Sequence, residues 1–196
     1  MKSKRCFTGD RGELNDPLLR PLFNDVNECD DVLEKSDTQF ARRSLIRAAF
    51  AYHEGCIYWL KQHVKNWLIK MGMKNNNIEI VKLLLLDDSS FKPDQNGKIV
   101  EEPLRISFRN DCAFVLRTAA ECGGHDPVKL FSDNGWREMQ VALDVRHRIT
   151  HPKKPEDLDI TDSELDSLRE SFRWFYNCMV DILNTAIGKA RTPYGA

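Results

Sequence analysis

The sequence predicts an all-α fold, an up-and-down helical bundle with a small β-hairpin or ordered loop near residues 91–100. Three observations carry this prediction. Apolar residues recur every three to four positions over long stretches, which is typical of amphipathic helices. Capping and breaking residues separate these stretches, and the one convincing β signal is the pair Asn96-Gly97. Amphipathic helices of this kind bury their apolar faces by packing around one core, and the Asn96-Gly97 pair accounts for the hairpin.

The first half of the chain predicts three helices. A short one runs over about residues 17–35, and a long one over about 38–71. The three asparagines at 75–77 end that pattern, and the apolar run 78–86 is read as a helix because leucine dominates it. The long helix has one buried seam, formed by Ile46, Phe50, His53, Ile57, Leu60, Val64, Trp67 and Met71.

The second half continues the same pattern after the turn. Pro103 suits the first turn of a helix whose apolar face extends to Cys122, before two glycines end it. Another helix is expected from about Asn134, and its apolar stripe is in register with Arg146. The segment 161–164, Thr-Asp-Ser-Glu, fits a capping box and predicts a last helix that reaches about Gly188.

Size and composition limit the function classes. The 196 residues are 41% hydrophobic and 30% charged, which suits one domain, expected over residues 17–190 between a flexible leader (1–16) and a tail (191–196). The formal net charge of −1 argues against a generally basic, nonspecific nucleic-acid binder. Six cysteines without a Cys-x-x-Cys pair indicate reduced thiols in a cytoplasmic protein. The sequence has no apolar run of about 18 residues and no glycine-rich phosphate loop, so we expect no membrane association and no cofactor.

The segment Arg146-His147-Arg148-Ile149-Thr150-His151-Pro152 carries the strongest chemical signal. Arginine offers a planar fork that matches phosphate oxygens, and histidine is the side chain whose ordinary pKa is nearest neutrality. On an unbroken helix, Arg146 and His151 would lie about 140° apart around the axis. Pro152 disfavours helical geometry at His151, so that histidine is expected on the frayed last turn, where it can reach a ligand that Arg146 also contacts. The segment therefore predicts a phosphodiester site, with a solvated helix terminus as the alternative.

Other residues are supporting candidates. His147 would assist phosphate binding or cap the helix end, whereas Arg148 points elsewhere and is interpreted as a surface or partner-facing charge. Glu54 either orients a catalytic cation or joins Arg47 in a surface network. Asp144, His147 and His151 have the spacing of helical metal ligands, but Pro152 and the two arginines disfavour a dication there, so no metal site is predicted.

The arrangement resembles the higher-eukaryote and prokaryote nucleotide-binding (HEPN) superfamily, whose hallmark is an arginine followed after four to six residues by a histidine. Arg146 and His151 fit that hallmark with four intervening residues, in the penultimate helical segment and ahead of a proline. Arg47 and His53 fit it too, with five. These two lie inside the long helix, where His53 falls on the apolar seam, and His53 is interpreted as a packed core histidine.

The resemblance implies a dimeric, metal-independent endoribonuclease with Arg146 and His151 as catalytic residues. RNA would be the substrate and a 2′,3′-cyclic phosphate the product. It also implies a toxin–antitoxin or antiviral setting with a protein antitoxin or regulator. The alternative is a noncatalytic helical module that dimerises and binds a nucleotide or protein through the same cationic helix end.

Overall fold

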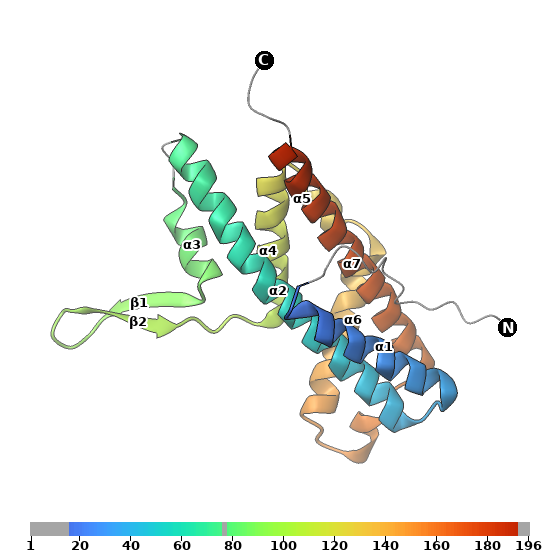
Figure 1. Ribbon diagram of the computed structural model, residues 1–196. Helices are drawn as coiled ribbons and strands as arrows, with labels where there is room; N and C mark the ends of the chain where they lie inside the picture. The colour runs from blue at the N-terminus through green and yellow to red at the C-terminus, as the bar shows by residue number, and fades with distance from the viewer. Residues whose placement is uncertain (1–15, 76–77, 192–196) are drawn as a thin grey trace. The chain divides into compact units, whose positions relative to one another are not determined.

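The computed structural model describes residues 16–75 and 78–191 (Figure 1). Within these ranges the chain forms seven α-helices, one short 3₁₀ helix and a two-stranded antiparallel sheet, which confirms the predicted all-α fold with a small hairpin. The elements are α1 (Leu19–Lys35), α2 (Gln39–Asn75), α3 (Ile80–Leu86), β1 (Ser89–Pro93), β2 (Ile99–Pro103), α4 (Phe108–Gly123), α5 (Pro127–Phe131), α6 (Asn134–Thr150), η1 (Pro155–Leu158) and α7 (Asp162–Arg191). Residues 1–15 of the predicted leader and 192–196 of the predicted tail lie outside the described residues.

Two compact units make up the chain, and the boundary between them falls within α2. One unit combines the described residues up to Cys56 with those from Val128 onward. The other comprises Ile57–Pro127. The single domain expected over residues 17–190 stays a prediction. Among the described helices, none is long and apolar enough to cross a membrane.

An aromatic core holds the first unit together. His53 of α2 is fully buried, and its ring centroid lies 5.4 Å from that of Phe50, 5.3 Å from that of Phe172 and 4.6 Å from that of Phe175. Neither ring nitrogen of His53 has a hydrogen-bond partner in the described part of the chain. The interpretation of His53 as a core residue is confirmed, and burial lowers its pKa to about 3 from the ordinary 6.5 because it disfavours the charged imidazolium.

Because His53 is buried and neutral, we expect the folded protein to lose stability as the pH falls. An unfolded chain protonates His53 near pH 6.5, whereas the folded chain keeps it neutral down to about pH 3. The unfolded state therefore binds more protons in this window, and the free energy of unfolding falls as the pH falls, by about 1.4 kcal/mol per pH unit from this group. Urea unfolding between pH 7 and 4.5 measures the slope, and His53→Leu should flatten it. Equal slopes in the two proteins would contradict the assignment.

Helix α6 packs against α7, and both begin at side-chain caps. At α6, the Asp133 carboxylate accepts the backbone N–H of Gly135 at 2.9 Å. At α7, Thr161 Oγ1 accepts the N–H of Glu164 at 3.3 Å, while Glu164 Oε2 accepts the N–H of Thr161 at 2.9 Å. The predicted capping box is confirmed, and it fixes the point at which α7 starts.

The hairpin of the second unit turns where the sequence predicts. Gly97 has a φ of +76°, a left-handed conformation that glycine adopts without strain, and Pro93 pairs with Ile99 across the turn. Pro103 was expected in the first turn of the next helix, and this was wrong. It ends β2 opposite Ser89, since the fixed φ of proline also suits the end of an edge strand. Helix α4 begins at Phe108, where the Ser107 hydroxyl accepts the N–H of Asn110.

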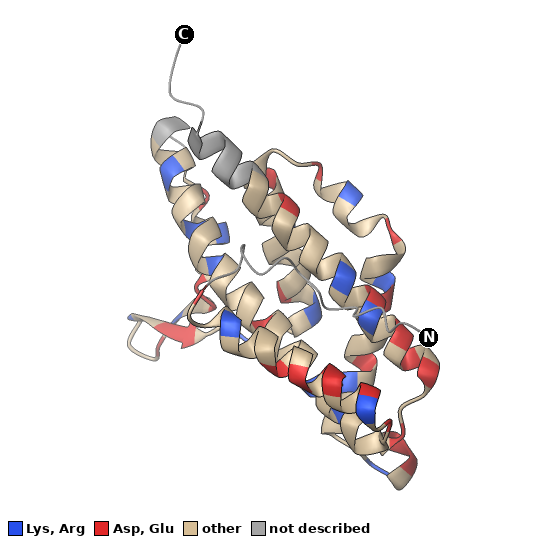
Figure 2. Cartoon of the chain, turned by 45° about the vertical axis from the view of Figure 1, so that its right-hand side comes forward, with Lys and Arg blue, Asp and Glu red and all other residues tan. Residues whose placement is uncertain are grey.

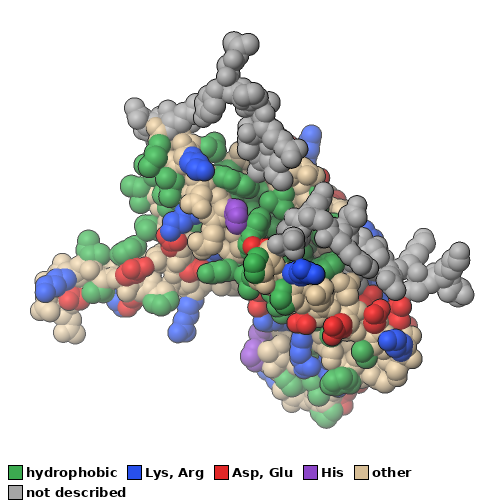
Figure 3. Space-filling model, viewed as in Figure 1, with side chains coloured by type: hydrophobic (Ala, Val, Ile, Leu, Met, Phe, Trp, Pro, Cys, Tyr) green, Lys and Arg blue, Asp and Glu red, His purple; other side chains and the backbone are tan. Residues whose placement is uncertain are grey.

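A buried lysine ties the hairpin to two helices of this unit. Lys61 of α2 is 4% exposed and donates to Asp88 at 2.6 Å and to Asp111 of α4 at 2.8 Å. Asp88 has a φ of +53°, which is uncommon for a residue other than glycine, and its backbone carbonyl accepts the N–H of Leu104 at 2.6 Å. Phe91, Ile99, Ile80 and Val81 leave apolar surface exposed on the hairpin and on α3 (Figure 3).

Candidate active site

Helix α6 positions the candidate catalytic segment at its C-terminal end. Its buried face consists of Gly135, Met139, Ala142, Val145 and Ile149, which recur at helical spacing. Arg146 lies at the border of this face, and its side chain is 32% exposed. Arg146 therefore lies at the edge of the core.

Glu54 of α2 pairs with Arg146. Nη2 of Arg146 donates to Oε1 of Glu54 at 2.8 Å, and both residues belong to the same unit. The structure gives Glu54 the partner Arg146, and its role in orienting a catalytic cation stays a prediction. Arg47 is exposed elsewhere on α2. A guanidinium has five N–H donors, so the pairing with Glu54 leaves donors of Arg146 for an anion.

His151 and His147 lie at the end of α6. The helix ends at Thr150, directly before His151, as Pro152 predicted. His151 has φ −127° and ψ 58°, and its backbone N–H still donates to the His147 carbonyl at 3.0 Å. The two imidazole rings are exposed, with centroids 5.1 Å apart. His147 is therefore the residue next to Arg146, and His151 follows Arg146 by five residues, about 1.4 helical turns.

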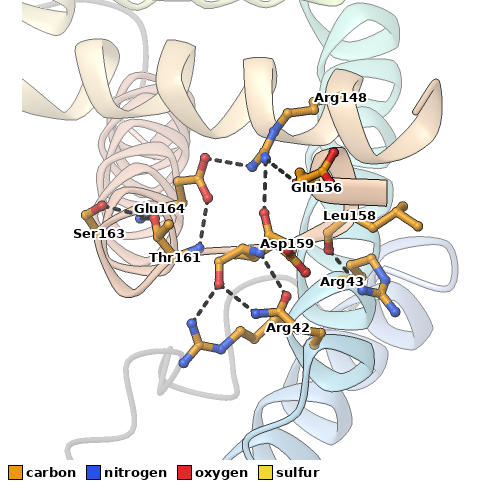
Figure 4. Close-up of polar contacts among 11 residues, drawn as sticks. Arg42, Arg43, Arg148, Glu156, Leu158, Asp159, Thr161, Ser163 and Glu164 are labelled. Carbon is orange, nitrogen blue, oxygen red and sulfur yellow. Dashed lines mark hydrogen bonds and ion pairs between the residues drawn. The ribbon is translucent and has the colours of Figure 1, made fainter. Parts of the chain in front are cut away.

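Arg148 has a different role from the one expected of a surface or partner-facing charge. Its guanidinium donates to the carbonyl oxygen of Asp159 at 3.0 Å and to the Glu164 carboxylate at 2.7 Å (Figure 4). A further, longer contact reaches the carbonyl oxygen of Glu156 at 3.5 Å. These contacts hold the chain that joins α6 to α7, and they direct Arg148 into the protein's own backbone.

Segments of Lys and Arg (blue) and of Asp and Glu (red) are interspersed along the helices (Figure 2). In the part of the chain that the structure covers, no three His, Cys, Asp or Glu side chains are arranged to hold a metal ion, and this includes Asp144, His147 and His151.

Sequence reasoning missed the residues that hold the chain after α6. Arg43 donates to the carbonyl of Leu158 at 2.9 Å, and Arg42 donates to that of Ile160 at 2.8 Å. Their positions at the start of a long helix give no sign of carbonyls more than a hundred residues away. Five of the six cysteines lie within the described ranges, and the sixth, Cys6, lies outside them.

The chain was compared with known proteins at three levels. No protein-family model, no curated protein and no solved structure matches it.

Proposed function

We propose that the protein is a metal-independent endoribonuclease that acts as a homodimer. Two protomers would bring the ends of their α6 helices together, so that a pair of Arg146 and a pair of His151 side chains flank one scissile phosphate. A single protomer offers one arginine at the site, and a second copy would supply the opposite proton-transfer group.

The observation that carries this proposal is the arrangement of Glu54, Arg146 and His151. Arg146 at the edge of the core pairs with Glu54 at 2.8 Å, and the exposed imidazole of His151 follows five residues later, where α6 ends. A fixed guanidinium stabilises charge that develops on phosphorus oxygens, and a histidine transfers protons near neutral pH. His147, whose ring lies beside that of His151, would contribute to phosphate binding.

The reaction is a transesterification within the RNA chain. One His151 takes the proton of the ribose 2′-hydroxyl, and its O2′ forms a bond to phosphorus while the bond from phosphorus to O5′ breaks. The second His151 gives a proton to the leaving 5′-oxygen. The products are a 2′,3′-cyclic phosphate and a 5′-hydroxyl, with no water consumed in this step.

Purified protein incubated with mixed RNA in excess chelator tests the proposal. We expect cleavage to proceed, with fragments that end in 2′,3′-cyclic phosphates. Mass spectrometry identifies these ends, and light scattering gives the oligomeric state of the same sample. Intact RNA under all conditions, from a folded dimer, would instead favour the noncatalytic binding module.

A further inference from the structure

The connection between α6 and α7, residues 152–161, is held in place along much of its length. Three successive carbonyl groups accept side-chain donors from other helices of the same unit: Leu158 from Arg43, Asp159 from Arg148, and Ile160 from Arg42 (Figure 4). Gln39 adds two more bonds to Ile160, one to its carbonyl and one from its N–H. A segment without long regular structure is thereby fixed in one conformation, because its polar backbone groups have specific partners.

Asp157 fixes the start of this connection. Its Oδ2 accepts the backbone N–H of Lys153 at 2.8 Å and that of Lys154 at 3.2 Å. The bond from Lys153 is the main cause that lowers the pKa of the Asp157 carboxyl below its ordinary value. The carboxylate thus binds the backbone of the two lysines, and both lysine side chains are exposed.

The same connection carries the exposed acidic residues Glu156 and Asp159, and two carboxylates at the start of α7 are paired with arginines. Glu164 pairs with Arg148 at 2.7 Å, and Asp162 pairs with Arg42 at 2.7 Å. Pro152 separates His151 from Lys153, and Lys154 comes next in the sequence. Two lysines therefore lie within three residues of His151, the candidate proton-transfer residue.

We propose that Lys153 and Lys154 bind backbone phosphates of single-stranded RNA next to the phosphate that is cleaved. The inference rests on the proposed function, since it takes RNA as the ligand. Lysine is a compact point charge that pairs with a phosphate without a fixed fork geometry, so these contacts add affinity without sequence preference. The bonds to Asp157 fix the backbone of both lysines before RNA arrives, so that only the lysine side chains have to be ordered on binding.

Binding to an RNA oligonucleotide with 2′-O-methyl riboses tests the proposal, because such RNA lacks the hydroxyl needed for cleavage. Fluorescence anisotropy is measured from 50 to 200 mM salt for wild type, Lys153→Ala, Lys154→Ala and the double variant. Each phosphate contact on a single strand contributes a slope of about −0.7 to log K against log salt. Each single variant should therefore reduce the loss of affinity over this fourfold range by about 2.6-fold, and the double variant by about sevenfold.

Alanine keeps the backbone N–H groups that Asp157 accepts, so these variants should fold, which circular dichroism checks. Lys98→Ala, an exposed lysine on the hairpin, is the matched control and should keep the wild-type slope. An unchanged slope in the double variant, or no RNA binding by wild type, overturns the proposal. The slope of log K against log salt could depend on the two lysines while unmethylated RNA stays intact. This result would contradict the nuclease function and support the phosphate contacts.

Discussion

Replacement of His151 by alanine is expected to lower kcat for RNA cleavage by about 10²–10⁴-fold, the range that general acid–base catalysis contributes. In the proposed dimer the variant loses both proton-transfer groups at once, while Arg146 and its partner Glu54 stay in place. The exposed side chain of His151 contributes little packing, so the free energy of unfolding should change by less than about 0.5 kcal/mol. Single-turnover cleavage of a labelled RNA measures the rate, and urea unfolding measures the stability.

Two further histidine variants sharpen this test. His147→Ala should cause a smaller loss than His151→Ala, since His147 is assigned to phosphate binding. His125→Ala removes an imidazole that belongs to the other unit and serves as the control. Cleavage by folded His151→Ala at the wild-type rate would rule out His151 as the acid or base.

The sequence predicted the elements of this fold well because their signals are local. The capping box at Thr161 and Glu164, the turn at Gly97 and the end of α6 before Pro152 each depend on residues within a few positions of one another. Pro103 shows the limit of such signals. Its fixed φ is compatible with both a first helical turn and the end of an edge strand, and only the pairing with Ser89 decides between them.

The contacts that build the candidate site are less predictable because they join distant segments. Glu54 and Arg146 are 92 positions apart, and spacing along α2 offered Arg47 as an equally plausible partner for Glu54. Arg148 was read as a surface charge because its carbonyl acceptors lie in a connection without regular periodicity. Backbone carbonyls leave no trace in an amino-acid sequence, so a side chain that binds them cannot be recognised from residue types alone.

Replacement of Arg146 by alanine is expected to lower kcat by roughly 10²–10³-fold, as does loss of one preorganised donor to a transition-state charge. The stability cost should be small, because the ion pair with Glu54 is partly exposed at both side chains and such pairs contribute about 0.2–1 kcal/mol. We therefore expect Arg146→Ala to lose most of its activity while it keeps most of its stability. Rates on RNA and urea unfolding of the same preparation measure the two effects.

Two companion variants identify what Arg146 supplies. Arg146→Lys keeps the charge but loses the planar fork, so it should recover only part of the rate. Glu54→Gln keeps most of the side-chain volume and removes the carboxylate that holds the guanidinium, so it should lower kcat less than Arg146→Ala does. If Arg146 acts on the reacting phosphate and Glu54 acts only through Arg146, then Glu54→Gln should cause no further loss in an Arg146→Ala background. A full additional loss in the double variant would show that Glu54 acts independently, and the pairing at 2.8 Å would then be structural only.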